Sequence, residues 1–535
     1  MQDNTKVHLS VHIASLDVPN PPSQVEASKP FDGPSCQLPR GAGSCPTEGV
    51  QAADQPGCRT DAPEELKVDF IASQEAARSW KVATPEKVDF VSKIFLASGI
   101  STTRTAIPAC LQPTQTQEPK TDLHSAQAEA KMVYGQVISE VLRKTGLAAT
   151  DIDILITNTS IYCPTPSIAS MVINMFSMRE DVQAYHLGGM GCAFGVVGLN
   201  MVRDMLKAHP GKTCLFVSSE IITGAFYPGH RKEALVTNAL FRMGGTASIL
   251  TNNPAWRSRS KYQLQHCLRV HTGASDRAYN ALNWEPDEEG INGMVITKTL
   301  PSEAANVLEK GVRRMTPRIM TWGQYAEAAV NYIQQAAAQV SNGKLCAAPA
   351  PYQPDYTRCA DHFLLHAGGY AILRGIQKGL RLPAQAMMPS FASLRDFGNT
   401  SSASTWYTWS YIESTDGVRK GQTVLQIGVG GGMKSGVAYW RALRDVRDIH
   451  PCWAHLGGKA LTEADLPRPI SNTYKSIFDL PSTRTAAEQQ QVIQATNAAP
   501  RVTLADAQQA AAAAEVIKLH AEAARSEGAA AVAAH

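Results

Sequence analysis

The stretch HLGGMGCAFGVVGLNMVRDML, residues 186–206, decides the fold. Its glycines lead a strand-like segment into Cys192, and an apolar helical pattern runs on over 193–208. A side chain presented at a helix N-terminus meets the positive end of the helix dipole, which favours a thiolate. Small neighbours, Gly191 and Gly195, let the chain turn tightly and let a substrate approach. We therefore expect Cys192 to be a nucleophile with a lowered pKa; the alternative is a buried cysteine that packs as a small hydrophobe.

Helix and strand patterns alternate on both sides of this stretch, which favours a layered α/β fold with two similar halves. The first half has predicted helices at 84–99, 125–144 and 193–208 and predicted strands at 152–157, 182–187, 213–219 and 246–252. The second half has predicted strands at 262–271 and 423–428 and predicted helices at 361–379 and 404–413.

Four segments follow from these patterns. Residues 1–61 are rich in Pro, Gly, Ser and Gln with little periodic hydrophobicity, so we expect a disordered leader. Residues 84–255 form the half with the nucleophile, and 256–453 form the second half. Residues 454–535 are an Ala-rich extension, for which we expect a solvent-exposed helix without chemistry.

Composition excludes several classes of protein. The chain has 535 residues, 44% of them hydrophobic, and its net charge is only +3 without any basic run, so a nucleic-acid partner is not expected. Its eleven cysteines are scattered, odd in number and without a C-x-x-C pair, as in reduced intracellular proteins. No run of about 18 apolar residues occurs, and the N-terminus lacks signal-peptide features, so no transmembrane segment is expected.

Two histidines, His362 and His366, stand four residues apart in HFLLHAGG and would share one face of a helix. H-x-x-x-H can also be a zinc pair, but Phe363 stands where that motif needs a general-base Glu, so a metal is not favoured. His271 closes the alternating strand KYQLQHCLRVH; a lone histidine at a strand end is more often structural.

The glycine-rich segment IGVGGGMKSG, residues 427–436, is not a dinucleotide loop. It lacks G-x-G-x-x-G, and no acidic ribose partner follows about 20 residues later in a strand. A nucleotide cofactor is therefore not predicted.

Six segments, in order, resemble the motifs of plant-type 3-ketoacyl-CoA synthases, the condensing enzymes that elongate very-long-chain fatty acids. These are members of the thiolase superfamily, related to chalcone-synthase-like type III polyketide synthases. The similarity covers residues 84–453. The segments are NTSIYCPTPSIASMVINMF, REDVQAYHLGGMGCAFG, LFRMGGTASIL, HTGA, HFLLHAGGYAIL and FGNTSSASTWY.

The resemblance implies a duplicated thiolase-like fold, layered α-β-α-β-α, and a catalytic triad of Cys192, His366 and Asn399. His362 and His271 match further histidines that the family treats as functionally important. The thiolate would accept the acyl group, and N–H donors from the histidine and asparagine would stabilise developing negative charge.

The same resemblance implies a decarboxylative Claisen condensation between an acyl-CoA and malonyl-CoA, without metal or redox cofactor. It implies a homodimer, contacts with other elongase components, and the endoplasmic reticulum. Because no transmembrane segment is expected, the protein would be peripheral there or cytosolic. The glycine loop at 427–436 would line the active site.

One residue departs from the family pattern: Arg395 replaces a histidine before the asparagine motif. An arginine stays protonated and cannot act as a base. We expect Arg395 to face the active site as a fixed charge or to turn toward the CoA phosphates. Two alternatives remain open, a type III polyketide synthase and a catalytically inert thiolase-fold protein that only binds acyl-CoA.

Overall fold

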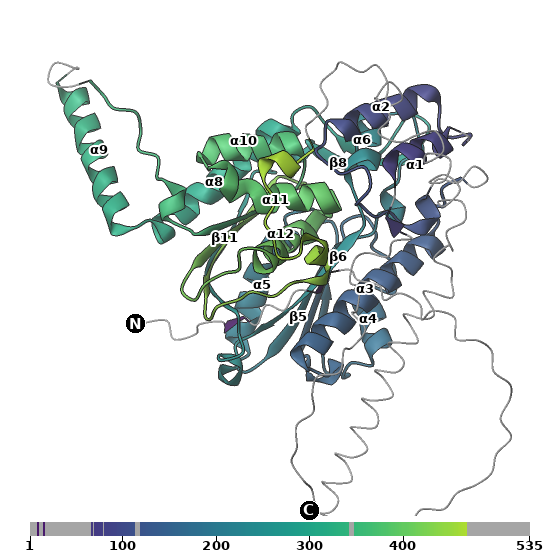
Figure 1. The fold of residues 1–535 in the computed structure, drawn as a ribbon, viewed down its shortest axis with the longest axis horizontal. Helices are drawn as coiled ribbons and strands as arrows, with labels where there is room; N and C mark the ends of the chain where they lie inside the picture. The colour runs from purple at the N-terminus through teal and green to yellow at the C-terminus, as the bar shows by residue number, and fades with distance from the viewer. Residues whose placement is uncertain are drawn as a thin grey trace, which may run out of the picture.

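The computed structural model describes residues 8–9, 14–15, 66–67, 69–78, 80–112, 118–341 and 347–467 (Figure 1). Strands of the first half lie in the order β4-β3-β5-β6. β3 is parallel to β4 and β5, and β6 is antiparallel to β5. Every residue of β3, β5 and β6 is buried, as expected for strands covered on both faces. The strands are β3 (Ile154–Asn158), β4 (Gln183–His186), β5 (Thr213–Glu220) and β6 (Gly244–Thr251).

The strands of the second half lie in the order β10-β11-β12-β7. β10 is parallel to β11, β12 is antiparallel to β11, and β7 is antiparallel to β12. The series from β3 through β5 to β6 has the same parallel and then antiparallel order, which fits two related halves. The strands are β7 (Tyr262–His271), β10 (His362–Leu365), β11 (Thr423–Gly430) and β12 (Lys434–Ala442).

Short strands near the N-terminus join the two halves. β1 (His8–Leu9) pairs with both β6 and β7, and β2 (Ala14–Ser15) pairs with β6. At these four residues the expectation of a disordered leader over 1–61 is wrong, because they form strands. The rest of that leader, and residues 468–535 with the predicted Ala-rich helix, lie outside the described residues.

Helices form three layers around the strands, so the layered α-β-α-β-α fold is confirmed. α5 (Phe194–Ala208) and α12 (Ser404–Ser414) lie in the middle, where α5 packs against β5, β7, β11 and β12. α3 (Leu123–Thr145) and α4 (Ile168–Phe176) cover the outer face of the first half. α8 (Leu300–Ile319) covers that of the second by packing on β7, β11 and β12, and α10 (Tyr370–Leu380) lies against α8 (Figure 1). The other helices are α1 (Phe70–Ala77), α2 (Pro85–Leu96), α6 (Lys232–Leu240), α7 (Asp276–Tyr279), α9 (Trp322–Val340) and α11 (Ala384–Phe397), and a separate hairpin joins β8 (Leu282–Pro286) to β9 (Asn292–Ile296).

The predicted helix at 361–379 was wrong in its first part. Residues 362–365 form β10, and the helix α10 begins only after Gly368 and Gly369. The apolar run Phe363-Leu364-Leu365 is too short for periodicity to distinguish a buried strand from a helix. His362 and His366 therefore do not share a helix face.

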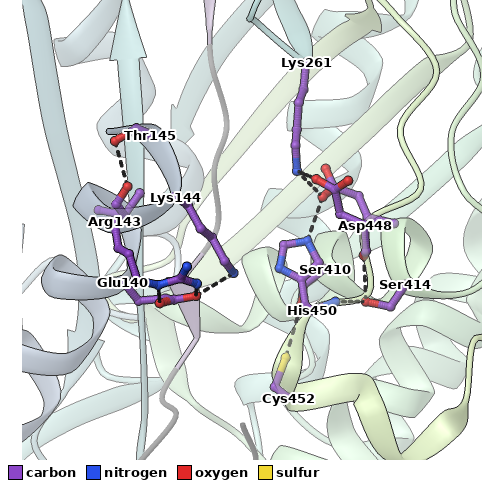
Figure 2. A network of polar contacts seen from close by, with 12 residues as sticks. Glu140, Arg143, Lys144, Thr145, Lys261, Ser410, Ser414, Asp448, His450 and Cys452 are labelled. Carbon is purple, nitrogen blue, oxygen red and sulfur yellow. Dashed lines mark hydrogen bonds and ion pairs between the residues drawn. The ribbon is translucent and has the colours of Figure 1, made fainter. Parts of the chain in front are cut away.

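Buried charges attach the segment after β12 to the middle layer (Figure 2). Glu413 of α12 is fully buried and accepts from Lys261 Nζ and His450 Nε2, both at 2.7 Å. Burial alone would raise the pKa of Glu413, but Lys261 and His450 lower it to about 2. Lys261 also pairs with Asp448 at 2.6 Å. These ion pairs hold residues 448–450 against α12.

Candidate active site

Cys192, His366 and Asn399 line one cavity of about 330 Å³ between the two halves. Its other walls are mostly apolar, with Leu240 and Phe241 on one side and Leu308 and Ile372 on another. Gly430 and Gly431 also line it, so the expected position of the glycine loop at the site is confirmed.

The turn before α5 holds Cys192 against the glycine loop. Gly191 has a φ of +66°, and a Cβ there would lie 2.8 Å from the backbone nitrogen of Gly431. A Cβ on Gly195 would lie 2.2 Å from the carbonyl oxygen of Ser402. Both glycines therefore permit close backbone contacts that fix the position of Cys192.

The thiol of Cys192 is favoured over the thiolate, so the expected lowered pKa was wrong. Cys192 is buried in an apolar cluster with Ile222 and Phe241, and this burial raises its pKa to about 11. A hydrogen bond from Ser401 and the charge of Lys434 oppose that effect, whereas the charge of Glu220 adds to it. The helix N-terminus does not outweigh desolvation, so attack by this sulfur would require a base that removes its proton.

His366 directly follows β10 and is 6% exposed. Its Nδ1 lies 3.3 Å from the hydroxyl of Ser404 on α12. Burial lowers its pKa to about 4, so the ring is neutral at neutral pH. A neutral imidazole offers one N–H donor and one acceptor, which suits both proton removal and oxyanion stabilisation.

Asn399 lies in the loop after α11, and its amide is held by backbone groups. Its Oδ1 accepts from the N–H of Ser401 at 2.9 Å, and its Nδ2 is 3.5 Å from the carbonyl oxygen of Gly368. Its backbone N–H donates to Leu240 of the first half at 3.0 Å. These contacts fix which amide atom can donate into the cavity.

Two residues beside Cys192 were missed from the sequence, Ser401 and Glu220. The Ser401 hydroxyl lies 3.5 Å from Cys192 Sγ and 3.1 Å from Glu220 Oε2, so its one proton can be donated to either. Ser401 has a φ of +53°, a strained conformation for a residue with a Cβ. Glu220 Oε1 accepts from the N–H groups of Ser160 and Ile161 at 2.8 and 3.0 Å. The available signal was an acidic residue closing the buried strand TCLFVSSE.

His362 and His271 are not among the residues that line the cavity. His362 begins β10, and its Nε2 lies 3.2 Å from Gln422 Oε1. His271 is exposed at the end of β7, opposite Lys434 in the strand register. Lys434 is the residue there that reaches the site, since its Nζ donates to the carbonyl of Met190 at 3.1 Å.

Arg395 does not line the cavity, so the expectation that it faces the active site is not met. It pairs with Asp396 at 2.6 Å and donates to the carbonyl of Asp465 at 3.2 Å. Asp396 is 1% exposed and also pairs with His455 and Arg104. A buried carboxylate needs such partners, which explains why the guanidinium turns away from the cavity.

We predict that Arg395→Ala lowers the free energy of unfolding by about 1–3 kcal/mol, because Asp396 loses a hydrogen-bonded cation. Burial alone would raise the pKa of Asp396, but His455 and Arg395 hold it below its usual value. Stability from this depressed pKa is present above the unfolded-state pKa and is lost as pH falls through the folded one, so the deficit should shrink in acid. Chemical unfolding at several pH values measures it. A raised KM for CoA substrates with unchanged stability would contradict this placement.

We predict that Ser401→Ala raises the apparent pKa of Cys192 by about one unit, since a hydrogen bond to the thiolate is lost. Alkylation by iodoacetamide across a pH series measures this pKa. Ser402→Ala is the matched control because the Ser402 hydroxyl instead donates to the carbonyl of Ser219. Equal shifts in both variants would count against a specific role for Ser401.

A second cavity, of about 120 Å³, adjoins the first at Phe241, which lines both. Its walls are mostly apolar and include side chains of α1, α2 and α6 and of the segments between helices. The buried guanidinium of Arg242 lies on the same wall. Phe241 therefore lies at the boundary between the cavity lined by Cys192 and a second apolar cavity.

No group of three His, Cys, Asp or Glu side chains that could hold a metal ion occurs within the described ranges. Over the same residues, no helix has the length and hydrophobicity needed to cross a membrane.

Comparisons with known proteins identify the family of this chain. The model of the FAE1/type III polyketide synthase-like protein family matches residues 58–337, and that of the 3-oxoacyl-[acyl-carrier-protein] synthase III C-terminal domain matches 358–442. A solved structure of the C-terminal type III polyketide synthase domain of Steely1 from Dictyostelium covers 82% of this chain and 99% of that domain, with a TM-score of 0.57 and 17% identity. This likeness supports the thiolase-like fold.

Curated relatives specify the family further. 3-Ketoacyl-CoA synthase 6 of Arabidopsis thaliana is 35% identical over 386 residues, 72% of this chain and 75% of the relative. 3-Ketoacyl-CoA synthase 16 of the same plant is 36% identical over 371 residues, 69% of this chain and 73% of the relative. The chain therefore belongs to the FAE1/type III polyketide synthase-like family of condensing acyltransferases, together with the plant 3-ketoacyl-CoA synthases.

Proposed function

We propose that this chain is a 3-ketoacyl-CoA synthase that joins a fatty acyl-CoA to malonyl-CoA through an acyl-Cys192 intermediate. One observation carries the proposal: Cys192, His366 and Asn399 come from three separate segments and line one apolar cavity. The relatives' names support the same activity and leave the polyketide synthase alternative with less support.

In the first step, Cys192 Sγ attacks the carbonyl carbon of the acyl-CoA thioester. The neutral imidazole of His366 accepts the thiol proton, because a thiol with a pKa near 11 must lose its proton as it reacts. The tetrahedral intermediate collapses, the bond to the CoA sulfur breaks, and CoA leaves as a thiol with the proton returned by His366. The acyl group remains on Cys192.

In the second step, malonyl-CoA loses carbon dioxide and its thioester becomes an enolate. N–H donors of Asn399 and His366 stabilise the negative charge on the thioester oxygen. The enolate carbon attacks the acyl-Cys192 carbonyl, a carbon–carbon bond forms, and the bond to sulfur breaks. The products are 3-ketoacyl-CoA and the cysteine thiolate, which takes up one proton from the solvent.

The acyl chain would extend along the apolar walls toward Phe241 and the second cavity. We predict that Phe241→Ala, by opening this boundary, shifts the products toward longer chains. Gas chromatography of products from a series of acyl-CoAs measures the shift. The same variant should cost about 3–5 kcal/mol in stability, so the comparison is made well below its melting temperature. An unchanged product distribution would exclude Phe241 as the end of the chain pocket.

The edge of the sheet supports a homodimer. Strand β4 has no second neighbour among the described strands, and Tyr185 on it is 40% exposed. An exposed edge of this kind can extend its sheet with a second copy. We also propose a peripheral position at the endoplasmic reticulum, next to other fatty acid elongase components.

The test is incubation of purified protein with radiolabelled malonyl-CoA and saturated acyl-CoAs of increasing length. A 3-ketoacyl-CoA two carbons longer than the primer is the expected product. Products of repeated extension and cyclisation would instead favour a polyketide synthase. Acyl-CoA binding without any product would identify an inert acyl-CoA-binding protein.

A further inference from the structure

Helix α9 projects away from the layered body, connected to it through α8 and a returning segment (Figure 1). Only Gln324 and Ala338 are buried among its nineteen residues. Several large apolar side chains are strongly exposed, including Trp322 at 88% and Val340 at 87%.

The amphipathic character of α9 is the reverse of that of a surface helix. Its polar face meets the protein: Asn331 Nδ2 donates to the carbonyl of Ala350 at 3.0 Å, and Gln335 Nε2 donates to that of Pro349 at 3.3 Å. Gln324 is fully buried and donates to the carbonyl of Asp355. An ordinary surface helix buries its apolar stripe instead. The apolar face of α9 is thus left for something outside this chain's described residues.

That apolar face is wide and aromatic. At 3.6 residues per turn, its apolar side chains occupy roughly 160° of the helix circumference. A coiled-coil seam with a second copy would be narrower. Trp and Tyr suit a boundary between hydrocarbon and water, since each has an apolar body and a polar tip. The exposed members are Trp322, Tyr325, Val330, Tyr332, Ile333 and Val340.

The charges around α9 are favourable for a negative surface. Its one acidic residue, Glu327, is already paired with Arg358 at 2.8 Å. Arg314 and Arg318 lie near the end of α8, shortly before α9 begins. Both are exposed, and neither has a carboxylate partner among the described residues. Cations beside an exposed apolar face favour anionic lipid headgroups.

We propose that α9 lies in the headgroup region of an anionic lipid membrane, with its apolar face toward the acyl chains. The helix is an interfacial element, since its nineteen residues are not apolar enough to cross a bilayer. This attachment brings the body to the surface into which long acyl chains partition. It does not depend on the condensing activity.

Co-sedimentation of the full chain with vesicles tests the proposal, using phosphatidylcholine alone and phosphatidylcholine with one-third phosphatidylserine. Wild type should bind the anionic vesicles more tightly. The variant Trp322→Gln/Ile333→Gln/Val340→Gln should lower the partition coefficient at least tenfold, because it removes three apolar side chains that the membrane would bury. Leu123→Gln/Ile449→Gln, which removes exposed apolar side chains elsewhere, is the matched control and should bind as wild type does.

A charge variant, Arg314→Gln/Arg318→Gln, should weaken binding to anionic vesicles while leaving binding to neutral ones unchanged. Equal vesicle binding by the triple variant and wild type would overturn the proposal. A second outcome would also overturn it: the wild type does not bind vesicles but dimerises with increasing concentration, and the triple variant does not dimerise. The apolar face of α9 would then be an interface with a second copy of the chain.

Discussion

Cys192→Ser is expected to abolish condensation while the protein remains folded. A serine hydroxyl has a far higher pKa than a thiol and forms no acyl-enzyme at a useful rate without a stronger base. The two side chains are nearly equal in size, so the packing around residue 192 should persist. Radiolabelled malonyl-CoA incorporation measures the loss, and thermal unfolding checks the fold.

Cys163→Ser is the control for that experiment. Cys163 is an exposed thiol whose Sγ would lie 2.5 Å from a Cβ on Gly188, so it is close to the same turn. It should retain condensation. If Cys163→Ser is inactive and Cys192→Ser is active, the nucleophile has been assigned to the wrong thiol.

His366→Ala and Asn399→Ala are each expected to lower decarboxylation of malonyl-CoA by about a hundredfold or more, as the loss of an oxyanion donor does elsewhere. His366→Ala should have the further effect of slowing acylation of Cys192, because the same imidazole accepts the thiol proton. Release of labelled carbon dioxide measures the first effect, and single-turnover acyl transfer measures the second.

His362→Ala is the matched histidine control. His362 contacts Gln422 at the far end of β10 from His366. The fold-decrease in the decarboxylation rate should therefore be at least ten times smaller for His362→Ala than for His366→Ala. An equal loss of decarboxylation activity in the two variants would show that lining the cavity does not determine which histidine takes part in catalysis.

Much of the fold was predictable because its elements have clear periodicity. Strand β7 has the predicted bounds of 262–271, and α5 and α12 match within a residue. The failure at 361–379 came from a four-residue apolar strand, whose pattern does not differ from part of a helix. Pairing of residues 8–9 with β6 and β7 could not be predicted, because two-residue strands carry no periodicity.

At the site, the sequence could name chemistry-bearing residues but not their surroundings. Cys192, His366 and Asn399 were predicted from motifs, and their common cavity depends on bringing the segment of Cys192 to two segments that follow 174 and 207 residues later. The pKa of Cys192 was predicted in the wrong direction, because burial by Ile222 and Phe241 is a tertiary effect. Arg395 lies outside the cavity because it pairs with Asp396, whose burial could not be seen in the sequence.

Mass spectrometry of the acyl-enzyme tests the central claim most directly. The protein is incubated with an acyl-CoA in the absence of malonyl-CoA, digested at low pH and analysed for peptide masses. The account predicts that the peptide containing Cys192 gains the mass of one acyl group and loses it when malonyl-CoA is added. Acylation of another cysteine, or 3-ketoacyl-CoA formation with Cys192 never acylated, would contradict it.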